Sequence, residues 1–311
     1  MRRIIIALLV LIVSLMFVGC GGVFFRQWPQ PSEHLPVSHE LDSVPFYPQE
    51  AYQCGPASLS MVLTWSGIQA NPETITPEVF TPSRKGSLQS AMIGAARRHG
   101  RLAYLITGPD AMFEEVAAGH PVIVLQNLGL SWYPVWHYAV VVGYDLHKGT
   151  VILHSGVTPR KPLSFRVFYN TWARSDYWGL LVLSPSRLPA MATKHNYISA
   201  VLGLEKARQW RAAIEGYNTA LARWPDSLSA RMGLGNSYYA LGELESAEAA
   251  FREATRRFPT DGMAFNNLAQ VLWDQGKQQD ALEAASRAVD LDGPLVEEYR
   301  RTLKEIQAGK P

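Results

Sequence analysis

Residues Gln49–Ser58 read QEAYQCGPAS, and this stretch decides how the first half of the chain folds. After Cys54, apolar residues recur at helical spacing up to Gly67. Pro56 suits the first turn of a helix, because no backbone donor is lost there. Cys54 is therefore expected at the N-terminus of a buried helix. Free backbone N–H groups and the helix dipole favour a thiolate at that position, and a thiolate attacks carbonyl groups.

The alternative for a lone cysteine is a buried structural thiol that behaves as a small apolar side chain. The wider pattern favours catalysis, since Gln49 precedes the cysteine and His137 opens the apolar run HYAVVVGYD that ends at Asp145. This order of Gln, Cys-Gly-Pro helix start and later His resembles the bacteriocin-processing, double-glycine-leader peptidase family. The resemblance covers about residues 43–185. It implies a papain-like α+β fold and cysteine peptidase activity.

The resemblance also implies the roles of three residues. Cys54 would attack the peptide carbonyl, and His137 would take the thiol proton and return it to the leaving amine. Gln49 would donate its side-chain amide to the oxyanion, and Gln53 is the alternative donor because it adjoins the cysteine. An ion pair between Cys54 and His137 would lower the thiol pKa below its free value of about 8.5.

The residue that orients the histidine departs from the family pattern, which has an Asp on the strand after the histidine strand. Here that strand, expected at 150–155, offers His154 and then Ser155. We assign the orienting role to His154, although a neutral imidazole cannot stabilise an imidazolium as a carboxylate does. Asp145 is the alternative, but it falls in a hairpin turn that its side chain would serve. A Cys–His dyad can also react without a third residue.

The other elements of the first domain, which would span 43–187, follow from periodicity and composition. Trp132 and Trp136 lie in a loop directly before His137, and they would either line a substrate cleft or belong to the core. We expect helices at 87–99 and 110–118, and strands at 102–106, 121–126, 137–144, 150–155 and 179–184.

Residues 1–19 have the pattern of a signal peptide, with two arginines before the uncharged run Ile4–Val18. This run is shorter than the about 20 residues that a membrane-spanning helix needs. Gly19-Cys20 resembles the site at which bacterial lipoprotein signals are cut, which implies lipidation of Cys20. Gly21 after the cysteine resembles lipoproteins sorted to the outer membrane. We therefore expect an exported protein anchored by lipid on the periplasmic face of that membrane.

The cysteine count supports a working role for Cys54. The chain has two cysteines, and lipidation of Cys20 would leave Cys54 without an intramolecular disulfide partner. The proline-containing stretch 20–42 has no apolar periodicity and would form a tether. A composition of 47% hydrophobic and 18% charged residues, with a net charge of +2, is that of a globular protein and does not indicate nucleic-acid binding.

A repeat organises the second half of the chain. Pro225, Pro259 and Gly293 lie 34 residues apart, which is the tetratricopeptide period. The expected repeats are 194–227, 228–261 and 262–295, followed by a capping helix, so the repeat domain would span 194–311. The expected fold class is an α+β papain-like cysteine peptidase domain followed by an all-α tetratricopeptide repeat solenoid.

These features predict a membrane-tethered, exported cysteine peptidase that cleaves peptide bonds and docks a protein partner or substrate on its repeats. Family resemblance implies cleavage after small residues such as paired glycines. An inactive peptidase-like scaffold that works through its repeats is the alternative, and amide or ester transfer by the same thiol is a third possibility. No cofactor, metal or nucleic acid is expected.

We expect Cys20→Ala to release the protein from the membrane, because the lipid on this residue would be its anchor. Fractionation of cells that express the variant checks this. Inhibition of the lipoprotein signal peptidase should also accumulate the uncut precursor. Unchanged processing and unchanged membrane association in both experiments would contradict the lipoprotein assignment.

Overall fold

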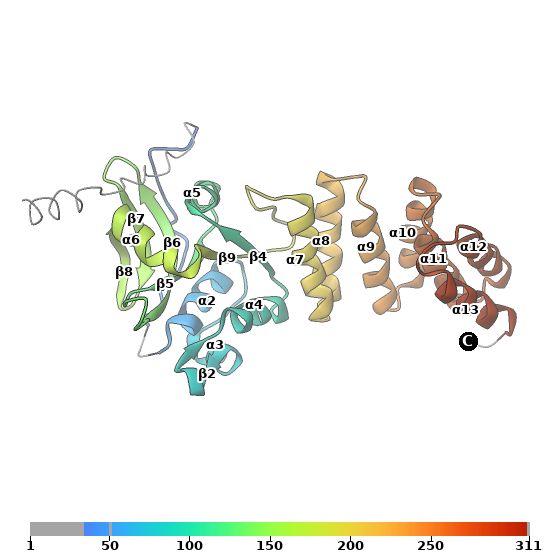
Figure 1. Ribbon diagram of the computed structural model, residues 1–311, viewed down its shortest axis with the longest axis horizontal. Coiled ribbons are helices and arrows are strands. Elements are labelled where there is room, and N and C mark those ends of the chain that lie inside the picture. The colour runs from blue at the N-terminus through green and yellow to red at the C-terminus, as the bar shows by residue number, and fades with distance from the viewer. Residues whose placement is uncertain (1–33, 50–51, 310–311) are drawn as a thin grey trace, which may run out of the picture. The chain divides into compact units, whose positions relative to one another are not determined.

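The computed structural model describes residues 34–49 and 52–309, shown as coloured ribbon in Figure 1. The predicted signal peptide, Cys20 and most of the predicted tether lie outside these residues. Within the described ranges, no helix combines the length and apolar character needed to cross a membrane.

The first domain is α+β, as the sequence predicts. Its helices are α2 (Cys54–Trp65), α3 (Pro72–Val79), α4 (Gln89–Arg98), α5 (Pro109–Ala117) and α6 (Phe165–Trp172). Its strands are β1 (Ser38–Glu40), β2 (Phe80–Thr81), β3 (Gly86–Ser87), β4 (Leu102–Thr107), β5 (Val122–Asn127), β6 (Trp136–Asp145), β7 (Thr150–Ser155), β8 (Thr158–Ser164) and β9 (Trp178–Leu183). Short 3₁₀ turns occupy Pro82–Arg84 and Ala173–Ser175.

Seven strands form one sheet in the order β4-β9-β5-β6-β7-β8, with β1 paired to the far end of β6. All of these pairings are antiparallel. The tether predicted to reach residue 42 therefore ends earlier, because Ser38–Glu40 adds a strand to the sheet. The backbone of this strand comes so close to Gly143 that a Cβ on Gly143 would lie 2.7 Å from the His39 carbonyl oxygen.

The two faces of the sheet carry different helices. On one face, Ile123, Val140 and Val182 belong to the same buried cluster as Leu59 and Val62 of α2. This cluster buries the apolar side of α2 and holds its first residue close to β6. In Figure 1, α2, α3 and α4 lie together on this side.

An aromatic cluster covers the opposite face. Phe113 of α5 packs edge-on against Tyr144 of β6, with ring centroids 5.1 Å apart, and against Phe165 of α6 at 5.4 Å. Edge-to-face geometry at this separation is favourable for aromatic rings. The β6 strand is thus buried on both faces, as the Ala139–Val142 run predicts.

A β-bulge divides β6 into two registers. The pairing runs Val141↔Leu153 on one side of the bulge and Gly143↔Ile152 on the other. Alternate residues of a regular strand share a face, and the bulge reverses this order. Val142 accordingly belongs to the α2 side of the sheet, whereas Tyr144 contacts Phe113 on the opposite side.

The second domain is all-helical. Three helix pairs repeat every 34 residues, since their first helices begin at Lys194, Leu228 and Gly262. The helices are α7 (Lys194–Lys206), α8 (Trp210–Arg223), α9 (Leu228–Ala240), α10 (Leu244–Arg257), α11 (Gly262–Asp274), α12 (Gln278–Asp290) and the final α13 (Val296–Gln307). Small buried residues let paired helices approach, as where Gly235 faces the ring of Phe251.

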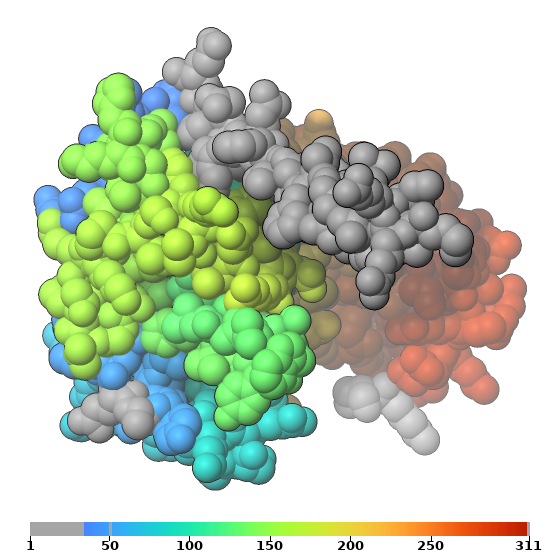
Figure 2. All heavy atoms as spheres, turned by 60° about the vertical axis from the view of Figure 1, so that its left-hand side comes forward, coloured from blue at the N-terminus to red at the C-terminus, as the bar shows by residue number. Residues whose placement is uncertain are grey.

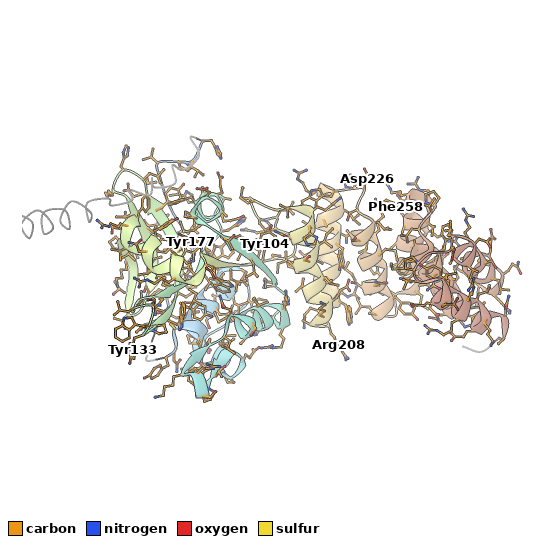
Figure 3. All side chains as sticks on the ribbon, in the orientation of Figure 1. Tyr104, Tyr133, Tyr177, Arg208, Asp226 and Phe258 are labelled. Carbon is orange, nitrogen blue, oxygen red and sulfur yellow. The ribbon has the colours of Figure 1, made fainter. Side chains whose placement is uncertain are left out.

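A buried carboxylate holds the linker between the two domains. Glu115 of α5 is 0% exposed, and its two oxygens accept hydrogen bonds from the backbone N–H groups of Ala190 and Met191, both at 3.0 Å. The same carboxylate contacts Nδ1 of His120 at 2.8 Å. The hydroxyl of Tyr104, which is labelled in Figure 3, donates to the carbonyl oxygen of Met191 at 3.4 Å. The linker is therefore fixed by specific contacts to the first domain.

We expect Glu115→Ala to lower the free energy of unfolding of the first domain by about 2–4 kcal/mol, because it leaves buried donors without an acceptor. Protease cleavage near Met191 should accelerate. Chemical denaturation and limited proteolysis measure the two effects, with Asp110→Ala, an exposed change on the same helix, as the control. Equal behaviour of the two variants would show that Glu115 does not hold the linker.

Candidate active site

Cys54 is the first residue of α2, as the sequence predicts. The helix start is packed tightly, because a Cβ on Gly55 would lie 2.3 Å from the Oγ of Ser87 on β3. Only glycine fits at this position without displacing β3. The hairpin that carries β3 therefore lies directly beside the start of α2, next to Cys54.

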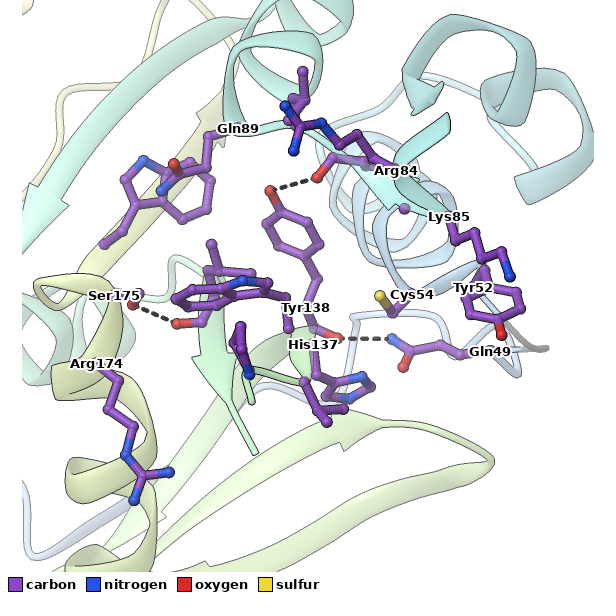
Figure 4. Close-up of a pocket in the computed structure, with 18 of the residues that line it drawn as sticks. Gln49, Tyr52, Cys54, Arg84, Lys85, Gln89, His137, Tyr138, Arg174 and Ser175 are labelled. Carbon is purple, nitrogen blue, oxygen red and sulfur yellow. Dashed lines mark hydrogen bonds between the residues drawn. The ribbon is translucent and has the colours of Figure 1, made fainter. Parts of the chain in front are cut away.

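Cys54, His137 and Gln49 line one cleft of about 1090 Å³ (Figure 4). The thiol comes from the start of α2, the imidazole from the start of β6, and the amide from the segment before α2. Thus His137 meets Gln49 and Cys54, which lie more than 80 residues before it in the chain, in one cleft. Other walls come from the β2–β3 hairpin, the loop before His137, and the segment after α6.

His137 is fixed by a hydroxyl. It pairs with Gln126 of β5 in the sheet, and its Nε2 lies 2.9 Å from the Oγ of Ser155. When Nε2 carries the proton and donates it to Ser155, Nδ1 presents its lone pair as the base. Ser155, the last residue of β7, is therefore the side chain that bonds the imidazole of His137.

The assignment of His154 as the orienting residue is corrected by its contacts. Its Nε2 lies 3.2 Å from the carbonyl oxygen of Val44, and its Nδ1 accepts the backbone N–H of Arg160 at 3.2 Å. Both ring nitrogens are thus engaged with backbone groups, and neither bonds His137. The ring also packs edge-on against Phe46, with centroids 5.3 Å apart.

The bulge in β6 explains why Ser155 takes the place of its neighbour. Paired residues share a face, so His154 lies on the face of its partner Val140, and Ser155 lies on the other face with His137. Next to the hairpin turn, Gly143 pairs with Ile152. If that register continued along the two strands without the bulge, His154 would pair with Val141 and would lie on the same face as His137. A shift of one residue exchanges the two faces.

The alternative orienting residue, Asp145, is engaged in the hairpin turn. Its carboxylate accepts the backbone N–H of Lys148 and forms a salt bridge with the ammonium of the same residue.

The amide of Gln49 connects three elements of the site. Its Nε2 donates to Ser58 Oγ on α2 at 3.2 Å and to the Tyr138 carbonyl on β6 at 3.3 Å. Its Oε1 accepts the backbone N–H of Gly156, after β7, at 2.8 Å. Gln53, the rival donor, points its amide oxygen at the Thr76 hydroxyl of α3 and does not line the cleft.

Burial opposes charge on both reactive groups. Burial raises the pKa of the Cys54 thiol above its ordinary value, although backbone hydrogen bonds at Tyr138 and Gly55 act in the other direction. Burial, with a smaller effect of the Lys161 charge, lowers the pKa of His137 to about 4. The predicted resting ion pair and depressed thiol pKa are therefore not favoured. Burial thus favours the neutral form of both groups.

The tryptophan loop before His137 lies at the surface and not in the core. Trp132 is 78% exposed and Tyr133 is 69% exposed, and Tyr133 and Trp136 line the cleft. In Figure 2 the loop belongs to the pure green surface at the lower centre of the view, and Tyr133 is labelled in Figure 3. The Asn127 side chain accepts the N–H groups of Gly129 and Val135, which fixes the loop.

Sequence reasoning missed several supporting residues. Ser58 and Gly156 hold the Gln49 amide, Ser155 holds the imidazole, and Arg174 donates to the carbonyls of Asn127 and Gly129. Three of these residues bond the side chain of Gln49 or His137, and Arg174 bonds backbone carbonyls, at sequence separations that range from 9 to 107 residues. Alternation along β7 would have indicated Ser155 only if the bulge had been known. In the part of the chain that the structure describes, no group of three His, Cys, Asp or Glu residues could hold a metal ion.

In comparisons with known proteins, separate family models match the parts of the chain before and after the linker at Ala190 and Met191. Residues 41–178 match the family model described as the Peptidase_C39 like family, and 200–262 and 233–295 match tetratricopeptide repeat models. A curated relative, the small glutamine-rich tetratricopeptide repeat-containing protein 2 of Mycosarcoma maydis, is 29% identical over 86 residues. That alignment covers 28% of this chain and 24% of the relative, so the chain spans about a quarter of that protein's length.

Solved structures resemble the two domains separately. A putative C39-like peptidase from Bacillus anthracis matches with 17% identity and a TM-score of 0.40, covering 47% of this chain and 97% of its own. The TPR2B domain of yeast Sti1, solved as a pHsp70 complex, matches with 16% identity and a TM-score of 0.36, covering 38% of this chain and 98% of its own. A thermophilic tetratricopeptide protein from Thermus thermophilus matches with 23% identity and a TM-score of 0.35, covering 37% of this chain and 64% of its own.

We expect alkylation of Cys54 by iodoacetamide to be slow at pH 7 and to accelerate as the pH rises, because the raised thiol pKa keeps the thiolate scarce until alkaline pH. His137→Ala should leave this pH midpoint nearly unchanged, since the imidazole is neutral above about pH 4 and contributes no cation. The measurement uses a Cys20→Ala background, in which Cys54 is the single cysteine.

The control is His147→Ala, a histidine exposed in the hairpin turn and away from the cleft. Fast alkylation below pH 7 that slows in His137→Ala and not in His147→Ala would show a resting ion pair and contradict the neutral assignment.

Proposed function

Because its first domain is Peptidase_C39-like and its second is a tetratricopeptide repeat domain, we propose that this chain is a thiol peptidase that cleaves peptide bonds. One observation carries the proposal. Cys54 at a helix start lines the same cleft as His137, whose distal nitrogen is held by Ser155. A nucleophile and a base in one cleft, with a partner that orients the base, is the arrangement that nucleophilic catalysis requires.

The reaction begins with concerted proton transfer from a neutral pair. His137 Nδ1 takes the thiol proton as the sulfur forms a bond to the substrate carbonyl carbon. The resulting imidazolium donates that proton to the leaving amine as the carbon–nitrogen bond breaks, which leaves a thioester on Cys54. Water, deprotonated by the same imidazole, then hydrolyses the thioester and restores the thiol.

The oxyanion has two donors in reach of the helix start. The Cys54 backbone N–H is free of intrahelical partners, because it belongs to the first turn of α2. The Gln49 Nε2 is the second donor, and its present bonds to Ser58 and Tyr138 are long at 3.2 and 3.3 Å. Turning one N–H from the Tyr138 carbonyl to the oxyanion exchanges a weak neutral bond for a charge-assisted one. Such a donor contributes about 3 kcal/mol to transition-state stabilisation.

An inactive, peptide-binding version of the same domain is the second candidate. The observation that favours it is the absence of a carboxylate from the described partners of His137, since Ser155 cannot stabilise an imidazolium as an aspartate does. The pKa shifts of Cys54 and His137 also disfavour the charged pair. In this alternative the cleft would still bind a peptide and would not cut it.

Location and docking complete the proposal. Lipidation of Cys20, motivated by the Gly19-Cys20 pattern, would anchor the exported protein to the periplasmic face of the outer membrane. The repeats would recruit a protein partner, since exposed polar pairs such as Tyr239–Asp274 and Asn236–Asn267 link neighbouring repeats along α9 and α11. Cross-linking of the full chain in cells should place partner peptides on these helices. Cross-links confined to the first domain would contradict docking on the repeats.

We expect Cys54→Ala to abolish cleavage of a quenched fluorescent peptide library and His137→Ala to lower kcat by about 10²- to 10⁴-fold. Ser155→Ala should lower kcat at least about tenfold, because the imidazole loses its orientation. Asp145→Ala is the matched control, as its carboxylate is engaged in the hairpin turn and should leave kcat unchanged.

Mass spectrometry of the products and of the thioester on Cys54 distinguishes the two candidates. Absence of cleavage across the library, with peptide binding retained, would favour the inactive binding domain. A larger loss in Asp145→Ala than in Ser155→Ala would contradict the orienting role of Ser155.

A further inference from the structure

The charges around the catalytic cleft are unequal. Among its described lining residues, Arg84, Lys85 and Arg174 are cations and Asp176 is the single carboxylate. The chain as a whole is nearly balanced, with 29 basic and 27 acidic residues. The excess of positive charge is therefore a local property of this cleft.

Two of these cations stand beside the nucleophile. Arg84 and Lys85 lie in the turn of the β2–β3 hairpin, whose Ser87 packs against Gly55, the residue after Cys54. The Tyr138 hydroxyl donates to the Ser87 carbonyl at 3.2 Å, which ties the hairpin to β6. The hairpin is thus held by the same two elements that carry the thiol and the imidazole.

The two hairpin cations have no carboxylate partner among the residues that the structure describes. Within the described ranges, neither Arg84 nor Lys85 forms a salt bridge, although carboxylates elsewhere in the domain pair with Arg98, Lys148 and Arg160. The Lys85 ammonium lies 5.9 Å from the ring centroid of Tyr52, another residue of the cleft wall. Arg174 differs, because its guanidinium donates to carbonyls of the tryptophan loop. Figure 4 shows Arg84 and Lys85 on the Cys54 side of the cleft and Arg174 on the far side.

The remaining walls suit the body of a peptide. Tyr52, Tyr133 and Trp136 are exposed aromatic residues that line the cleft, and Trp178 lies deeper. Flat aromatic walls bind extended chains with little side-chain specificity, whereas unpaired cations select charge. Lys161 on β8 adds to the positive field, since its charge acts on His137.

We propose that the cleft selects extended peptide segments with an aspartate or glutamate next to the bond presented to Cys54, held by Arg84 and Lys85. This inference rests on the proposed function for its cleavage arm and on the cleft alone for its binding arm. A substrate carboxylate would supply the negative charge opposite Arg84 and Lys85. It also brings negative charge toward His137, which favours the imidazolium that forms during attack.

The binding arm uses the full-length Cys54→Ala chain and fluorescein-labelled nonapeptides of alanine and glycine. Each peptide carries one Glu, moved through the nine positions, and each has a Gln twin. We expect Glu at one or two positions to bind more tightly than Gln by about two- to fivefold for each cation engaged. The preference should shrink when salt rises from about 0.05 to 0.5 M, because exposed charges are screened.

Variants locate the preference. Arg84→Gln and Lys85→Gln, made singly and together in the Cys54→Ala chain, should remove it in steps. Arg166→Gln removes the same charge from an exposed position on α6 outside the cleft, and should leave it intact. A Glu preference absent at every position, or one that survives in the double variant, would overturn the proposal.

The cleavage arm separates this inference from the proposed function. If wild type cleaves Glu and Gln peptides with equal kcat/KM, selection of acidic substrates fails while the peptidase assignment stands. If no peptide is cleaved but Cys54→Ala keeps a hairpin-dependent Glu preference, the peptidase assignment fails and acidic recognition stands. Binding to phosphatidylglycerol vesicles that depends on Arg84 and Lys85, without any Glu preference, would assign the cations to a membrane surface and also overturn the proposal.

Discussion

The hydrogen bonds of the Gln49 amide hold the whole site together. One side chain bonds α2 through Ser58, β6 through the Tyr138 carbonyl, and the end of β7 through the N–H of Gly156. These three elements carry the Cys54 thiol, the His137 imidazole and the Ser155 hydroxyl that bonds the imidazole. Gln49 is 7% exposed, so its bonds form away from competing water and their loss leaves buried groups unpaired. Besides its expected role as an oxyanion donor, Gln49 therefore has a structural role, since its hydrogen bonds connect α2, β6 and the end of β7. Replacing Gln49 by Ala would disturb geometry as well as the transition state, and so the residue is a poor probe of the oxyanion alone.

Much of the fold was predictable because local signals and tertiary packing agree. Cys54 does begin a helix, the strand at Thr150–Ser155 has the predicted bounds, and the 34-residue period does mark helix pairs. Two things were not predictable. The bulge in β6 depends on how two strands meet, and it exchanges the faces of His154 and Ser155. The pairing of Ser38–Glu40 with β6 joins segments about a hundred residues apart, which no local pattern reports.

Burial and local charge decide the electrostatics of the cleft. The position of Cys54 at a helix start led us to expect a lowered thiol pKa, but the cost of burying a thiolate is larger than the gain from nearby N–H groups. The same cost keeps His137 neutral. Under the proposed function, neutral Cys54 and His137 would exchange a proton only when a substrate occupies the cleft. The cations of the β2–β3 hairpin fit this account, because they have no salt-bridge partner within residues 34–49 and 52–309 and a bound carboxylate would supply one.

Covalent trapping by a peptide aldehyde tests most directly whether Cys54 is a nucleophile served by His137. The thiol sulfur adds to the aldehyde carbon, and the thiol proton passes through the imidazole to the new hydroxyl group. With a peptide that ends in ¹³C-labelled glycinal, NMR of the full-length chain should show a tetrahedral carbon bonded to sulfur. This signal should vanish in Cys54→Ala and weaken strongly in His137→Ala. An aldehyde that binds in the cleft without forming the carbon–sulfur bond would contradict the catalytic assignment, as would a signal indifferent to His137.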